Sequence, residues 1–271
     1  MSSTLRRRTP SGRPGIRSVA LPSEHGGWGL TLEPGLLGLL IAPSAAGACL
    51  GAAALVAFVA RTPIKIVLVD RRRHRSLPRT LLARRVAVVE VSALAVLVAV
   101  AFALADPWFW VPAAVAAPLI VVESWFEVRS RGRRLVPELS GAIGVCSVAA
   151  MIVLADGGRA RLAAALWMVL AGRVVTSIPY VRAQIARLHS RPTSAAGGVI
   201  ADAAALALAL GAVAVDRPLL AGAATVAAVI VIQRLIARGP VPRPVVLGMR
   251  QMAFGFGVVV AAALGVLATA G

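Results

Sequence analysis

Unbroken apolar runs of about twenty residues restrict the fold of this sequence more than any other feature. A helix of that length crosses the ~30 Å hydrocarbon core of a bilayer. The 271 residues are 59% hydrophobic, and the runs lack the polar–apolar alternation of a membrane β-barrel. The sequence therefore predicts an all-α fold, a polytopic transmembrane helix bundle of about nine spans. The predicted spans are residues 27–43, 46–69, 83–104, 108–125, 135–155, 161–181, 198–215, 218–236 and 248–269.

The charges between these runs predict the orientation of the bundle. The segments after the second, fourth, sixth and eighth spans are basic, whereas those after the third, fifth and seventh are nearly neutral. The basic segments include Arg71, Arg72, Arg73, Arg75, Arg79, Arg129, Arg131, Arg133, Arg134, Arg182, Arg187, Arg191, Arg238 and Arg243. Because basic loops stay in the cytoplasm, we expect the N-terminus inside and the C-terminus outside, in a multi-pass protein of the cell inner (plasma) membrane.

The net charge of +18 and its distribution along the chain indicate which classes of partner to expect. A soluble chain with this charge would suggest nucleic-acid binding. Here the arginines lie in short loops, and no basic face carries interleaved aromatic residues, so we expect no nucleic-acid partner. The expected surroundings are the lipid bilayer, with anionic lipid attracted to the basic loops.

The sequence predicts one folded unit. Residues 1–22, rich in Arg, Pro and Gly, are expected to form a disordered basic cytoplasmic tail, and residues 23–271 a single transmembrane helical domain. Cys49 and Cys146 lie inside apolar runs and are interpreted as packing residues. With three histidines in the chain, neither a metal site nor a cofactor is expected.

Charged residues inside the predicted spans need an explanation, because each costs ~2.5–3.5 kcal/mol at the centre of a span. Glu33 and Arg173 lie deepest, while Glu90, Asp202 and Arg250 lie nearer to helix ends. Such residues either pair with one another inside the bundle or belong to a binding site. Both interpretations remain open for Glu33 and Arg173.

Two short motifs are candidates for a site at the cytoplasmic side. The first, Ser23-Glu24-His25-Gly26-Gly27-Trp28, opens the first span. Glu24 and His25 are candidate ligand-binding residues, although helix capping and interfacial anchoring explain the serine and the tryptophan equally well.

The second motif is Arg61-Thr62-Pro63-Ile64-Lys65, near the inner end of the second span. A helical turn would put Arg61 and Lys65 on one face, which favours an anion site for a phosphate or carboxylate. The alternative is that both side chains extend to the interface and set the topology. Pro34, Pro112, Pro118 and Pro179 also fall inside predicted spans, where they are expected to kink or break the helices.

These two motifs, together with Asp70-Arg71-Arg72-Arg73, resemble the YwiC-like family of bacterial membrane proteins. A more distant similarity is to the UbiA-type prenyltransferases, in the stretches Arg75-Ser76-Leu77-Pro78-Arg79-Thr80 and Arg133-Arg134-Leu135-Val136-Pro137-Glu138-Leu139. That similarity implies a nine-helix fold. The chain lacks the aspartate-rich motifs that hold magnesium in those enzymes, so it does not imply their chemistry.

Three functions remain open, and the sequence does not decide whether the protein is an enzyme. The first is binding of an anionic amphiphile, an isoprenoid phosphate or a lipid headgroup, in a basic cytoplasmic-side cavity. The second is transport of a small anion or metabolite, and the third is a UbiA-like group transfer. The candidate ligand-binding residues are Glu24, His25, Glu33, Arg61, Lys65, Arg173 and Arg182.

Overall fold

A computed structural model of the chain describes residues 15, 19–21, 25–129, 132 and 134–270. Glu24 lies outside this part of the chain, and so does most of the predicted tail. Within the described residues the secondary structure is entirely helical, as predicted.

Nine α-helices and one short 3-10 helix make up the described part of the chain. They are α2 (His25–Ile41), α3 (Ala45–Arg72), α4 (Pro78–Leu104), α5 (Val111–Val128), α6 (Leu135–Ala155), α7 (Ala160–Leu188), α8 (Ala195–Val215), η1 (Arg217–Leu219), α9 (Leu220–Ile236) and α10 (Pro244–Ala270). Eight helical segments, with η1 and α9 counted together, are long and apolar enough to cross a membrane, and α2 is a shorter apolar helix. The predicted all-α membrane bundle is therefore confirmed.

The helix boundaries follow local sequence signals. The short connection between α2 and α3 ends at Ser44, whose Oγ accepts a hydrogen bond at 3.1 Å from the amide of Gly47 in the first turn of α3. Ser194 caps the start of α8 in the same way, because its Oγ accepts a hydrogen bond from the amide of Gly197. Such caps satisfy amides that a helix start leaves unpaired.

The prolines do not break the helices. Pro34, Pro118 and Pro179 lie inside the continuous helices α2, α5 and α7, so the expectation of a break is wrong at these positions, and a kink stays a prediction. Pro112 lies in the first turn of α5, where a missing amide proton costs little. Within a bundle, neighbouring groups can satisfy the carbonyl that each internal proline leaves without a donor.

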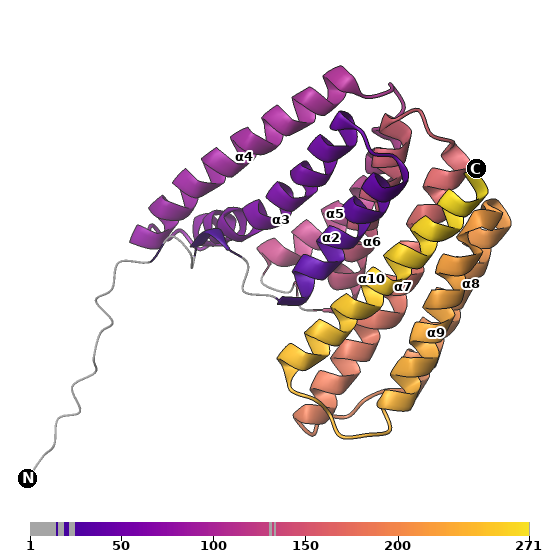
Figure 1. The fold of residues 1–271 in the computed structure, drawn as a ribbon. Coiled ribbons are helices and arrows are strands. Elements are labelled where there is room, and N and C mark those ends of the chain that lie inside the picture. The colour runs from indigo at the N-terminus through magenta and orange to yellow at the C-terminus, as the bar shows by residue number, and fades with distance from the viewer. Residues whose placement is uncertain (1–14, 16–18, 22–24, 130–131, 133, 271) are drawn as a thin grey trace, which may run out of the picture.

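Helices α6 and α7 form the centre of the bundle (Figure 1). Helices α2 and α10 pack beside them, α8 and α9 cover one side, and α3 with α5 covers the other. Helix α4 lies at the outer edge, packed mainly on α3. Small residues allow close approach: a Cβ on Gly172 would lie 2.9 Å from the carbonyl oxygen of Ala205. Such contacts are usual between membrane helices, where the hydrophobic effect does not drive association.

The basic loops and the nearly neutral loops lie at opposite ends of the bundle. At one end the Arg72 and Arg187 guanidinium groups donate to the carbonyl oxygens of Val128 and Ala237, at 3.3 and 2.6 Å, and so link helices that end there. At the other end Arg159 lies 3.8 Å from Asp216, and the amide of Asp106 donates to the carbonyl of Ala155. The alternation of loop charge along the sequence thus becomes a basic end and a nearly neutral end.

The positive-inside rule predicts that the basic end faces the cytoplasm. In a background with Cys49→Ala and Cys146→Ala, we expect Asp156→Cys to react with a membrane-impermeant maleimide in intact cells, and Ser76→Cys to react only after permeabilisation. Both positions are exposed loop residues at opposite ends of the bundle. The reverse labelling pattern would show that the bundle is inverted.

Candidate functional site

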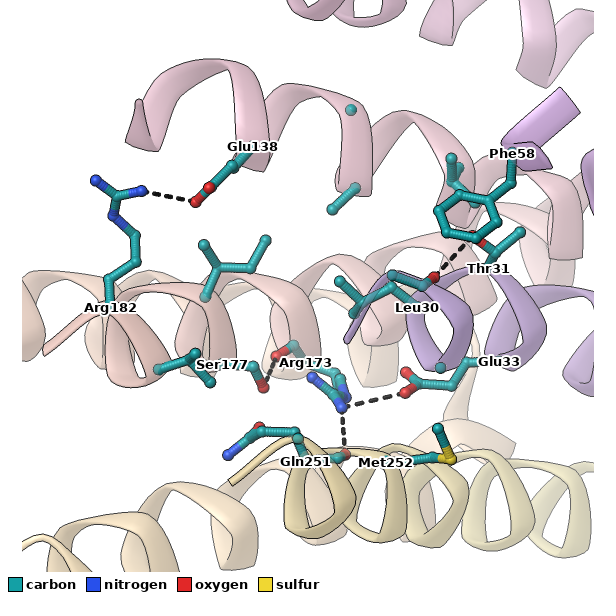
Figure 2. Close-up of a pocket in the computed structure, with 18 of the residues that line it drawn as sticks. Leu30, Thr31, Glu33, Phe58, Glu138, Arg173, Ser177, Arg182, Gln251 and Met252 are labelled. Carbon is teal, nitrogen blue, oxygen red and sulfur yellow. Dashed lines mark hydrogen bonds and ion pairs between the residues drawn. The ribbon is translucent and has the colours of Figure 1, made fainter. Parts of the chain in front are cut away.

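A cavity of about 710 Å³ lies inside the bundle, between α2, α3, α5, α6, α7 and α10 (Figure 2). Its walls are largely apolar and include Leu30, Phe58, Val145, Ile178 and Met252. Its charged lining residues are Glu33, Arg61, Glu123, Glu138, Arg173, Arg182 and Arg191. The structure thus brings four of the predicted site residues, Glu33, Arg61, Arg173 and Arg182, to one cavity.

The Glu33–Arg173 ion pair forms the polar floor of this cavity. Arg173 Nη2 lies 3.1 Å from Glu33 Oε1 and donates a second hydrogen bond at 2.5 Å to the carbonyl oxygen of Gln251. Both charged side chains are only 2% exposed, and they lie near the middle of α2 and α7. Pairing inside the bundle explains how these charges are tolerated. Both side chains also line the cavity, so they are placed to contact a ligand there.

A glycine of α10 makes room for the Glu33 carboxylate. A Cβ at Gly255 would overlap the carboxylate, whereas a Cβ at Gly257, in the same helix, would meet no atom within 4 Å. Gly141 of α6 does the same for the Glu123 carboxylate. The cavity therefore depends on glycines that allow buried carboxylates to lie against neighbouring backbone.

A chain of buried polar side chains continues from the floor toward α8. Gln233 Nε2 donates to Gln251 Oε1 at 3.2 Å, and Thr176 Oγ1 lies 3.3 Å from Gln233 Oε1 and 2.6 Å from Asp202 Oδ1. Asp202 in turn accepts a hydrogen bond at 2.6 Å from Arg234 Nε. These contacts link α7, α8, α9 and α10, and they satisfy the Asp202 carboxylate within the protein.

Two donors on the cavity floor find no acceptor among the described residues. They are Arg173 Nε and Gln251 Nε2, which are buried without a hydrogen-bond partner in that part of the chain, and both residues line the cavity. An unsatisfied buried donor costs about 1–3 kcal/mol. A ligand oxygen that reached them would recover part of this cost.

Arg61 and Lys65 are not free to act as a simple anion site. Arg61 binds Glu127 through two hydrogen bonds of 2.8 and 2.9 Å and lies 2.7 Å from Glu123, and Lys65 Nζ lies 3.2 Å from Glu127. Two cations four residues apart on α3 thus face two carboxylates four residues apart on α5. Lys65 is not among the residues that line the cavity.

Arg182 and Arg191 lie toward the basic end of the cavity. Arg182 Nη1 lies 2.8 Å from Glu138 Oε2, across from α7 to α6 (Figure 2). Arg191 is exposed in the loop after α7 and forms no ion pair with the described residues. The charged lining therefore has one more arginine than glutamates, and the surplus charge lies at the surface.

Gly27 and Trp28 of the Glu24–Trp28 motif take part in packing against α3. Helix α2 begins at His25, and Gly27 leaves room for the Phe58 ring, to which a Cβ there would come within 2.7 Å. Trp28 packs edge-to-face on the same ring, with centroids 5.2 Å apart. Glu24 lies outside the described residues, so its predicted role and that of His25 stay predictions.

No three of the His, Cys, Asp and Glu side chains described by the structure gather as metal ligands would. The groups that sequence reasoning missed are Glu123 and the glutamines Gln233 and Gln251. The spacing of Glu123 and Glu127 matches that of Arg61 and Lys65 and could have indicated the pairing. No comparable pattern points to the glutamines, because they meet across different helices.

Residues 21–153 match the family described as YwiC-like protein, which confirms the predicted resemblance over that segment. The segment contains Glu33, Arg61 and Glu127, whereas Arg173 and Gln251 lie beyond it. The chain matches no curated protein and no solved structure, so the similarity to the UbiA-type prenyltransferases is not confirmed.

Removing one partner of the buried pair should destabilise the bundle strongly. We expect Arg173→Gln to lower the free energy of unfolding by about 3–5 kcal/mol, because Glu33 would remain buried without its cation. The double variant Glu33→Gln/Arg173→Gln should lose clearly less. Arg161→Gln, an exposed change in the same helix, serves as the control and should stay within about 0.5 kcal/mol. Denaturant unfolding in detergent measures all three, and equal losses in the single and double variants would contradict the pairing.

The two neighbouring glycines of α10 should respond oppositely to alanine. Gly255→Ala should destabilise the protein by about 1–3 kcal/mol, because the added methyl group meets the Glu33 carboxylate. Gly257→Ala should be stabilising by up to about 1 kcal/mol, because it only improves helix propensity. Thermal unfolding of both variants tests this, and a similar shift for both would show that Gly255 does not contact Glu33.

Proposed function

We propose that this protein binds an anionic amphiphile, an isoprenoid phosphate or a lipid headgroup, in the cavity between α2, α6, α7 and α10. The observation that carries the proposal is a pair of buried donors on the cavity floor, Arg173 Nε and Gln251 Nε2, for which the described residues offer no acceptor. The headgroup oxygens of the ligand would accept hydrogen bonds from these two donors.

The size and lining of the cavity suit an amphiphile. A volume of about 710 Å³ falls within the range of about 300–1,000 Å³ typical of small-molecule sites. Phe58, Val145 and Ile178 offer apolar contacts to a hydrocarbon part. The surplus charge of Arg191 at the basic end would attract an anion toward the cavity.

The ion pairs change the expected role of Arg61 and Lys65. Glutamates neutralise both cations. In this proposal Arg61 and Lys65 therefore hold α3 against α5 and do not bind the ligand directly. Arg61 and Glu123 form part of the cavity wall there. The direct contacts to the ligand move to Arg173 and Gln251 in the centre of the bundle.

Transport of a small anion or metabolite is the second candidate. The observation that favours it is a buried ion pair near the middle of the short apolar helix α2 and of α7, which is long enough to span a membrane, because intramembrane charges often mark a substrate path. Such a protein would hold its substrate only transiently, so it would be empty after purification.

Filling the cavity should expel the ligand. We expect native mass spectrometry of the gently extracted wild-type protein to show a retained isoprenoid phosphate or phosphorylated lipid. Ala142→Phe, which puts a ring into the cavity wall, should weaken its retention at least about tenfold, a loss of about 1.4 kcal/mol.

Ala93→Phe makes the same substitution on the exposed face of α4 and should retain the ligand. Equal retention in Ala142→Phe and Ala93→Phe would show that the ligand lies elsewhere. An empty wild-type protein that carries only bulk lipid would overturn the proposal and favour transport.

A further inference from the structure

A second, separate groove lies on the outer surface of α5. It has a volume of about 510 Å³ and is lined by Arg72, Ile120, Val121, Ser124, Trp125, Val128 and Arg129. None of these residues lines the central cavity. The groove and the central cavity are therefore separate sites.

The apolar part of the groove faces the membrane. Val121 is 65% exposed and Trp125 59% exposed, although α5 is long and apolar enough to span a bilayer. A face of this kind on a spanning helix meets lipid acyl chains. Trp125 near the helix end matches the interfacial level at which tryptophan is enriched.

The basic part of the groove lies at the end of α5. Arg129 follows the last helical residue, and the carbon of its guanidinium lies 3.4 Å from the centre of the Trp125 ring. Stacking uses the flat face of the guanidinium and leaves the N–H donors at its edge available for a phosphate. The ring thus holds a cation at the interface.

Arg72 completes the basic part from α3. Its Nη1 donates to the Val128 carbonyl oxygen at 3.3 Å, which offsets the negative end of the α5 dipole beside the groove. Neither Arg72 nor Arg129 forms an ion pair with any side chain in the described part of the chain, unlike Arg61 and Lys65 nearby. The groove therefore joins an apolar surface to two arginines that no carboxylate of the described residues neutralises.

We propose that this groove is a specific site for one anionic phospholipid. Its phosphate would accept hydrogen bonds from Arg129 and Arg72, and an acyl chain would lie along Ile120 and Val121. The site differs from the general attraction of basic loops for anionic lipid, because it depends on the Trp125 ring and on two particular arginines.

Lipid titration of the full-length protein by native mass spectrometry tests the site. The probes are phosphatidylglycerol and phosphatidylcholine with the same acyl chains. We expect the wild-type protein to bind its first phosphatidylglycerol more tightly than its first phosphatidylcholine. Arg72→Gln/Arg129→Gln should weaken that first binding about thirtyfold, from the usual contribution of two basic residues near an anionic surface.

Arg84→Gln/Arg85→Gln is the matched control. It removes the same charge from exposed positions near the start of α4, at the same end of the bundle, and should leave the first binding unchanged. An equal loss in both double variants would show general attraction only and would overturn the proposal. So would equal binding of the two lipids by the wild-type protein.

Trp125→Leu keeps both arginines and removes the ring. We expect the first phosphatidylglycerol to bind about two- to fivefold more weakly, because the Arg129 guanidinium loses its stacking partner. This variant decides the question if Arg72→Gln/Arg129→Gln does not fold, as judged by its thermal unfolding. Unchanged binding in a folded Trp125→Leu protein would overturn the proposal.

Discussion

The ion pair between Glu33 and Arg173 is the interaction on which the centre of the bundle depends. It joins α2 to α7, and the second hydrogen bond of Arg173, to the Gln251 carbonyl, adds α10. Neither charge is tolerable alone at this depth, so the three helices have one favourable arrangement. Gly255 must lack a side chain for that arrangement to form. The cavity lies next to this ion pair, and the arrangement of the three helices determines the shape of the cavity.

The many arginines of the chain have distinct physical roles. Arg61 and Arg182 pair with glutamates across helix interfaces, and Arg187 donates to carbonyl oxygens at the end of α9. Four helices, α3, α5, α7 and α9, end at the basic side, where cations also complement the negative ends of helix dipoles. Arg187, one of the loop arginines from which the orientation is predicted, therefore also stabilises a helix end.

The architecture was predictable from the sequence, but most of the site geometry was not. Apolar run length and loop charge are local properties, so the helices and the basic end of the bundle could be predicted directly. The sequence also showed that burying Glu33 and Arg173 costs free energy, because a charged residue inside an apolar run can be recognised from its immediate neighbours in the sequence. Which helices touch decides whether Glu33 pairs with Arg173, whether the glutamines meet, and whether glutamates neutralise Arg61. A single sequence does not show which helices touch. The wrongly expected breaks at Pro34 and Pro179 have the same origin, because neighbouring helices decide whether a proline is tolerated.

The separation of Glu33 from Arg173 along the chain has a consequence for biosynthesis. The two residues are 140 positions apart, and ribosomes add about 5–20 residues per second. Glu33 therefore emerges about 7–28 s before its partner. The ion pair, and with it the final packing of α2 against α7, can therefore form only after α7 has been synthesised.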